Sequence, residues 1–206
     1  MAFAYGQYRN SRNAAWECLL EYGINTLPVH VSRLAKALQI KLIPYHKCPH
    51  VLQQTGFSAV SRGSDAFSTR GANGVWYVFF DMQVTPSTRI KFTLTHEIAH
   101  IILGHPLSGP TAAPFEFRKQ NPIETEANVF ASRLLAPACV LMELGVHTPE
   151  EIMQLCGLSY KAALIRAQRM EVLYRRDRWY TDPLECRVRD QFMPFIKRTR
   201  VHSLNK

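Results

Sequence analysis

The chain has 206 residues, of which 47% are hydrophobic and 20% are charged, a balance that indicates a globular protein and excludes an intrinsically disordered one. No apolar run reaches the roughly 18–20 residues of a transmembrane helix. The first residues lack the basic and apolar pattern of a secretory signal, so we expect a cytoplasmic protein without a membrane partner. The net charge is +9, and residues 161–206 carry 12 basic against 5 acidic residues.

The first 81 residues predict short helices followed by a small sheet. Apolar spacing indicates helices over residues 13–22 and 30–38. Runs of β-forming residues indicate strands over 41–45, 56–62 and 74–81. The last of these is a candidate to pair with an extended peptide at an exposed sheet edge, although its residues also suit a core.

From Thr85 onward the pattern is helical. Thr85-Pro86 and Asn121-Pro122 combine a capping residue with a proline at the first helical position, which predicts helices over 85–103 and 122–135. The segment between them is expected to be a loop. Two further helices are predicted after Thr148 and Ser159, and Met193-Pro194 is expected to break any helix near the C-terminus. The fold class is therefore α+β, with a small, mostly antiparallel sheet packed on helices and a helical C-terminal region.

Five cysteines are present, and none has a partner at C-x-x-C spacing. This excludes a cysteine-based zinc knuckle and a C-x-x-C redox site. We expect reduced, mostly buried thiols.

Residues 96–100 read His-Glu-Ile-Ala-His in the middle of the predicted helix 85–103. Histidines four residues apart lie on one helix face one turn apart, so His96 and His100 can reach the same metal ion. Glu97 adjoins the first ligand and is placed to act as general base toward a water at the metal. The pattern predicts an HExxH zinc site of the zincin type.

The third zinc ligand is open to more than one assignment. The metzincin pattern requires glycine at 103 and histidine at 106, and Leu103 and Pro106 exclude it. His105 misses the required spacing by one residue, and we expect it just past the helix end, bonded to the last carbonyls. It is also the nearest candidate for the fourth protein ligand that a purely structural zinc site would need.

The helix 122–135 supplies carboxylate candidates. Glu124 and Asn128 lie one turn apart and share a face, whereas Glu126 points roughly 200° away from Glu124. We favour Glu124 as the ligand, with Asn128 hydrogen-bonded to the far nitrogen of a ligand histidine, and keep Glu126 as the alternative.

The segments 92–105 and 123–137 resemble the ImmA/IrrE family of zinc metallo-endopeptidases, a gluzincin-like group. Their sequences are Phe-Thr-Leu-Thr-His-Glu-Ile-Ala-His-Ile-Ile-Leu-Gly-His and Ile-Glu-Thr-Glu-Ala-Asn-Val-Phe-Ala-Ser-Arg-Leu-Leu-Ala-Pro. The resemblance is strong over residues 75–137 and fades after about residue 175. It implies that His96, His100 and Glu124 bind Zn²⁺ and that Glu97 is the catalytic base. Ala136 stands where the family usually has methionine, a position that we expect to serve packing.

The resemblance also implies a function. Members of the family are intracellular regulatory proteases that typically cleave a helix-turn-helix repressor, often one encoded beside them on a prophage or mobile element. We therefore expect a cytoplasmic zinc metallo-endopeptidase whose partner is a protein substrate such as a transcriptional repressor.

The expected organisation has three parts. Residues 1–145 would form the zinc metallopeptidase domain, 146–178 a helix-turn-helix-like hairpin, and 179–206 a basic tail. The basic C-terminal residues would suit nucleic acid, but few side chains of the second hairpin helix could read base edges, so a role in packing is favoured over DNA contact. The rival interpretation of the chain is a DNA- or protein-binding regulator with a non-catalytic zinc site.

Overall fold

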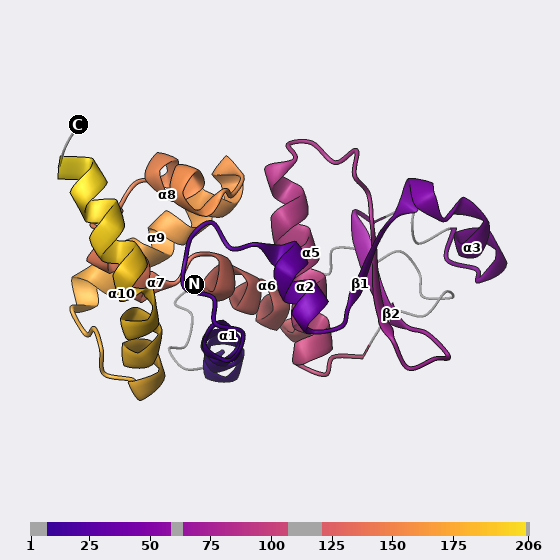
Figure 1. Cartoon of the computed structure of the whole chain (residues 1–206), viewed down its shortest axis with the longest axis horizontal. Coiled ribbons are helices and arrows are strands. Elements are labelled where there is room, and N and C mark those ends of the chain that lie inside the picture. The colour runs from indigo at the N-terminus through magenta and orange to yellow at the C-terminus, as the bar shows by residue number, and fades with distance from the viewer. Residues whose placement is uncertain (1–7, 59–63, 107–120, 205–206) are drawn as a thin grey trace. The chain divides into compact units, whose positions relative to one another are not determined.

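The computed structural model describes residues 8–58, 64–106 and 121–204 (Figure 1). The chain is α+β and divides into two compact units, one made of Met1–Val29 with Val129–Lys206 and one made of His30–Asn128. None of the described helices combines the length and the apolar character of a transmembrane span. The three-part division at residues 145 and 178 stays a prediction.

The unit His30–Asn128 holds the sheet. Its described elements are α2 (Val31–Ala37), β1 (Lys41–Pro44), the 3-10 turn η1 (Tyr45–Lys47), α3 (Pro49–Gln54), β2 (Ala66–Arg70), β3 (Trp76–Phe80), α5 (Thr88–Ile102) and the first turns of α6 (Pro122–Leu135). The predicted helix 30–38 and the predicted strands 41–45 and 74–81 are confirmed to within a few residues.

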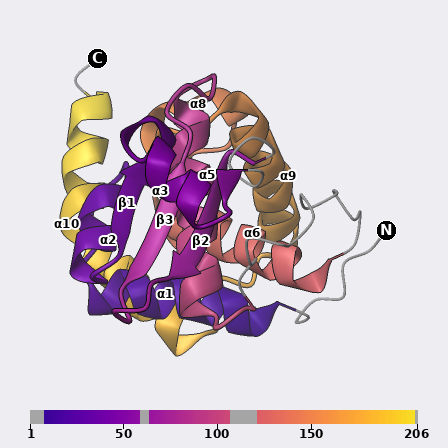
Figure 2. The same cartoon turned by 90° about the vertical axis from the view of Figure 1, so that its right-hand side faces the viewer.

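The sheet has three strands in the order β1-β3-β2, as Figure 2 shows. β1 runs parallel to β3, and β2 runs antiparallel to it. The sheet is therefore mixed, and the expectation of a mostly antiparallel sheet is wrong, because η1, α3 and β2 all intervene before the chain pairs with β1 again. β3 lies in the middle, which also corrects the expectation that residues 74–81 offer an exposed edge.

A strand is predicted over 56–62, but the described residues Gly56–Ser58 lie in a turn and at the start of a helical segment. The rest of the predicted strand, residues 59–62, lies outside the described residues. The strand that pairs with β3 is β2, at residues 66–70. Phe57 has the burial expected of a strand residue, but it reaches the core from beside α3, where its ring stacks on Phe67 at 4.7 Å.

The two faces of the sheet have different coverings. On one face, Phe67 and Phe79 stack at 5.2 Å and join Leu52 of α3 in an apolar core. Successive strand residues point to opposite faces, so Ser68 and its cross-strand neighbour Val78 lie on the other face, which α5 covers. Both residues are buried, and the helix with the HExxH residues therefore rests directly on the sheet.

The start of α5 differs from the prediction, whereas α6 begins where predicted. Thr85-Pro86 precedes the helix, α5 begins at Thr88, and the residue before it, Ser87, makes no side-chain cap. Asn121, in contrast, accepts a hydrogen bond from the backbone of Ile123, so the cap predicted for α6 is confirmed.

The unit made of the two chain ends is helical within the described residues. It contains α1 (Arg9–Glu21), the rest of α6, α7 (Ala138–Glu143), α8 (Pro149–Cys156), α9 (Tyr160–Arg176) and α10 (Pro183–Leu204). The caps predicted at Thr148 and Ser159 are confirmed, and α8 and α9 pack as a hairpin. Ala136 is fully buried, as expected for a packing position, and its carbonyl accepts hydrogen bonds from the buried guanidinium of Arg166. None of the five cysteines, all of which lie in the described residues, forms a disulfide, and four of them are buried.

The C-terminal residues form one long helix, although the sequence predicts a break at Met193-Pro194. Pro194 lies inside α10. A proline within a helix costs about 3 kcal/mol through a lost hydrogen bond and a steric clash. Burial of apolar side chains offsets this cost here, because α10 packs on α1 and α7 and fully buries Val188, Phe192 and Ile196.

Candidate metal centre

α5 brings the two motif histidines together on one face. The Nε2 atoms of His96 and His100 lie 3.0 Å apart, and His100 is buried. The helix is amphipathic, its contacts with β2 and β3 hold it on the sheet, and Ile98 and Ala99 are fully buried. The predicted convergence of His96 and His100 is confirmed.

Glu124 of α6 completes a group of three. Its Oε2 lies 3.1 Å from Nε2 of His96 and its Oε1 lies 3.5 Å from Nε2 of His100. Ligands bound about 2.0–2.1 Å from zinc in a tetrahedron lie about 3.3 Å from one another. The observed separations bracket that value, and these three side chains form the group of potential metal ligands found in the described part of the chain. The residues present thus fit a zinc ion.

Asn128 lies where the sequence predicts it, beside the outer ring nitrogen of His96. Its Oδ1 is 3.0 Å from Nδ1 of His96, the ring nitrogen that faces away from the convergence point. Since the amide oxygen can only accept, the contact favours a proton on Nδ1 of His96 and leaves Nε2 directed toward Glu124.

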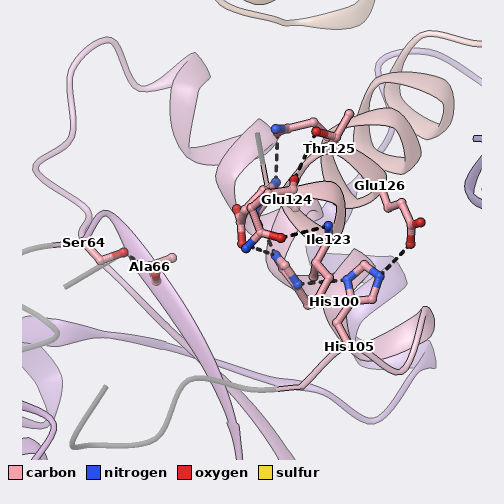
Figure 3. Close-up of polar contacts among 11 residues, drawn as sticks. Ser64, Ala66, His100, His105, Ile123, Glu124, Thr125 and Glu126 are labelled. Atoms are coloured by element: carbon pink, nitrogen blue, oxygen red, sulfur yellow. Dashed lines mark hydrogen bonds and ion pairs between the residues drawn. The ribbon is translucent and has the colours of Figure 1, made fainter. Parts of the chain in front are cut away.

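His105 and Glu126, the rival ligands, form a pair of their own. Nε2 of His105 lies 3.0 Å from Oε2 of Glu126, and Nδ1 of His105 lies 3.0 Å from Nδ1 of His100 (Figure 3). Both ring nitrogens of His105 are therefore engaged, one by Glu126 and the other by Nδ1 of His100, the nitrogen of that ring that faces away from His96 and Glu124. The expectation that the His105 ring bonds the last carbonyls of α5 is wrong, since its backbone N–H makes that contact, to His100.

The side chain of Glu97 points toward strand β2 of the sheet. It accepts hydrogen bonds from both the side chain and the backbone N–H of Ser68 in β2. Although part of its surface is exposed, protein atoms surround its carboxyl closely, and this burial raises its pKa against the opposing effects of His96 and Ser68. A carboxyl with a raised pKa is a better proton acceptor for general base catalysis near neutral pH.

The charges at the three converging residues are mutually dependent. Burial opposes protonation of His96, but its hydrogen bond to Glu124 and the nearby carboxylates together raise its pKa. The hydrogen bond from His96 is the main cause of the lowered pKa of Glu124. Burial, together with the charge of His96, lowers the pKa of His100 and so favours its neutral form. A neutral imidazole and an ionised carboxylate are the forms that bind metals. The shifts at His100 and Glu124 favour those forms, whereas His96 would have to release the proton that it donates to Glu124.

Sequence reasoning missed two features of the site. The bond from Ser68 to Glu97 had no signal, because the strand was expected over residues 56–62, which do not include Ser68. The pairing of His105 with Glu126 had a weak signal, since Gly104 ends the helix and turns the chain back.

Residues 70–168 match the model of the peptidase M78 family, described as an IrrE N-terminal-like domain. No curated protein matches the chain closely enough to count as a relative. The matched segment includes every residue of the group His96, Glu97, His100, Glu124 and Asn128. The match supports a metallopeptidase-type function. The part of the chain from residue 70 to residue 168 therefore belongs to the IrrE N-terminal-like family, the ImmA/IrrE family that the sequence resembles.

Proposed function

We propose that the protein is a zinc-dependent endopeptidase of regulatory type, which hydrolyses a peptide bond in a cytoplasmic protein. The observation that carries the proposal is the convergence of His96, His100 and Glu124 at separations suited to one tetrahedral ion, with Glu97 on the same helix. A catalytic zinc site keeps a position open for water or substrate. Three converging ligands, with His105 and Glu126 engaged elsewhere, meet that requirement among the described residues.

The roles of the residues follow from their positions. His96, His100 and Glu124 would hold the ion, and Asn128 would orient the ring of His96. Zinc at such a site polarises a scissile carbonyl and lowers the pKa of a bound water toward about 7. The carboxylate of Glu97 accepts the proton of the attacking water and then delivers it to the leaving amine nitrogen.

The edge of β2 that pairs with no other described strand is the element best placed to bind an extended substrate. The backbone of Asp65 bonds to Asp81, and Phe67 lies opposite Phe79. In an antiparallel pair the intervening residues turn their backbone groups away from the partner strand, so those of Ala66 and Ser68 turn outward, where the carbonyl of Ala66 accepts from the hydroxyl of Ser64. The N–H of Ser68 reaches Glu97, which means that a chain added along this edge would pass beside the proposed base.

The class of substrate follows from the family resemblance, and a strand-adding site is consistent with it. Pairing along a sheet edge requires a locally extended chain. We propose a helix-turn-helix repressor cleaved in such an extended segment. A candidate repressor that remains intact after long incubation with the zinc-loaded protein would count against this substrate.

The metal centre is tested by measuring zinc per chain with elemental mass spectrometry in the wild type, Glu124→Ala and Glu126→Ala. We expect about one zinc ion in the wild type, a near-complete loss in Glu124→Ala and a smaller loss in Glu126→Ala, because Glu126 contacts His105 and lies outside the group of His96, His100 and Glu124. The two variants are matched, because both remove a partly exposed carboxylate from the first turns of α6. Equal zinc in Glu124→Ala and wild type would remove Glu124 from the ligands.

The peptidase step has a separate test. Hydrolysis of a protein substrate by the wild type, and its loss in Glu97→Gln with zinc retained, would support the enzyme. Retained zinc with no hydrolysis by any form would favour a regulator with a non-catalytic zinc site.

A further inference from the structure

We propose that His105 and Glu126 are a positioning pair that fixes the tautomer of His100, so that His100 presents an unprotonated Nε2 to the metal. The inference rests on the proposed function, because it takes His100 as a metal ligand. It assigns a role to two residues that lie outside the group of His96, His100 and Glu124.

The direction of each hydrogen bond follows from Glu126. An ionised carboxylate can only accept, so the 3.0 Å contact with Glu126 places a proton on Nε2 of His105. A neutral imidazole carries one proton, which leaves Nδ1 of His105 as an acceptor. The 3.0 Å contact between the two Nδ1 atoms then requires His100 to donate, and its Nε2 is left with a free lone pair.

The chain holds His105 firmly in this position. Its side chain is only 8% exposed, and its backbone N–H donates to the carbonyl of His100 at 2.9 Å. Gly104 makes the turn possible, because its φ of +67° lies in the left-handed region that other residues rarely adopt. Figure 3 shows the His105 ring between His100 and Glu126.

The two histidines of the motif thus have different supports. Asn128 supplies an oxygen to Nδ1 of His96, and His105, supported by Glu126, supplies a nitrogen to Nδ1 of His100. Glu124 and Glu126 are two residues apart near the start of α6, so they point to different sides of the helix. Glu124 would be the ligand, and Glu126 is the carboxylate of the positioning pair. Loss of an outer hydrogen-bond partner of a ligand histidine typically weakens metal binding 10–100-fold.

The experiment compares His105→Leu with His105→Asn in the full chain. The two replacements have nearly the same size and shape, but only asparagine keeps an oxygen at the δ position that can accept from His100. Dissociation constants for Zn²⁺ are measured by competition with a chromogenic chelator. We expect 10–100-fold weaker binding in His105→Leu and a value within about threefold of wild type in His105→Asn. Wild-type affinity in His105→Leu, or equal losses in both variants, would overturn the proposal.

The tautomer itself is measured in the metal-free protein by long-range nitrogen–proton NMR of the histidine rings. We expect the proton of His100 on Nδ1 in the wild type and a shift of population to Nε2 in His105→Leu. A wild type with the His100 proton on Nε2 overturns the positioning role whatever the metal results are. A wild type that binds no zinc, in contrast, overturns the proposed function and with it the need for positioning, so the two failures are distinguishable.

Discussion

The two compact units of the chain bury polar side chains for different purposes. In the unit His30–Asn128, titratable groups of α5 and α6 are brought within hydrogen-bond distance of one another, around a point where three of them could hold an ion. In the unit formed by the chain ends, the most deeply buried charged side chain among the described residues is Arg166. Its guanidinium donates hydrogen bonds to the backbone carbonyl of Ala136.

This difference indicates how each unit should respond to substitution. Titratable side chains packed together without a counter-ion are unfavourable for folding, since each has lost part of its hydration. Such groups persist in sites where they serve chemistry. Replacing them should therefore alter metal binding or catalysis more than stability, whereas replacing a core residue of the helical unit should do the reverse.

Glu97→Gln tests this contrast most severely. Glutamine keeps the size of the side chain and its ability to accept from Ser68, but it cannot take up a proton. We expect hydrolysis to fall about 10²–10⁴-fold, the usual contribution of a general base, with zinc content unchanged. Rates measured with zinc-loaded protein give the effect, and an unfolding curve close to that of wild type is the control. Near-normal hydrolysis would exclude Glu97 as the base.

For Phe192→Ala in the helical unit we expect the opposite effect, a loss of stability with no change in zinc content. Phe192 is fully buried where α10 packs, and loss of a buried phenylalanine ring costs about 3–5 kcal/mol. Denaturant unfolding should show a loss of this size, while the zinc content of the folded fraction stays at the wild-type value. Exposed Val201 on the same helix provides the control, because Val201→Ala should change the free energy of unfolding by less than about 0.5 kcal/mol. A small loss in Phe192→Ala would mean that α10 is not packed as described.

Helix α10, which carries Phe192, also illustrates where prediction of the fold from sequence fails. Helices with local signals, such as the caps at Asn121, Thr148 and Ser159, begin where predicted. α10 contains Pro194, so its local signal argues against a continuous helix, and only packing on α1 and α7 makes it favourable. β2 is a similar case, because its position is set by register against β3 and not by its own pattern.

The candidate site was more predictable than the sheet, for a geometric reason. The spacing of His96, His100, Glu124 and Asn128 acts within helices, where positions four residues apart necessarily share a face. The contacts of Glu124 and Asn128 with His96 join two helices whose motifs resemble a known family, whereas the missed contacts, from Ser68 to Glu97 and from His105 to Glu126, join elements outside those helical patterns. Contacts of that kind depend on how the elements pack, which helical periodicity does not encode.

Asn128→Ala sharpens the contrast within the site-bearing unit. It removes the oxygen that faces Nδ1 of His96 without touching a proposed ligand. We expect zinc binding about 10–100-fold weaker, measured by chelator competition, with little change in unfolding of the metal-free protein. Asn128→Asp keeps an acceptor at the same position and should bind zinc at least as tightly as Asn128→Ala. If the alanine variant binds zinc as the wild type does, the orientation of His96 is fixed by other contacts.

The smallest effect is expected at the N-terminus of α8, which belongs to the helical unit. Thr148 accepts from the backbone of Glu151, and the Glu151 carboxylate accepts from the backbone of Thr148 and of His147, a complete capping box. Thr148→Ala should lower the free energy of unfolding by about 1 kcal/mol, measured by urea denaturation at neutral pH. Zinc content should not change.

The same cap gives a pH dependence with a defined sign. The two backbone hydrogen bonds lower the pKa of Glu151 in the folded protein. Its ionised form therefore contributes stability above the ordinary glutamate pKa of about 4.3, and this contribution is lost as the pH falls through the lowered folded value. Glu151→Gln should be less stable than wild type near pH 7, and the difference should shrink on acidification below about pH 4. A difference that is constant with pH would mean that the carboxylate charge does not contribute, and that the cap acts through the hydroxyl of Thr148.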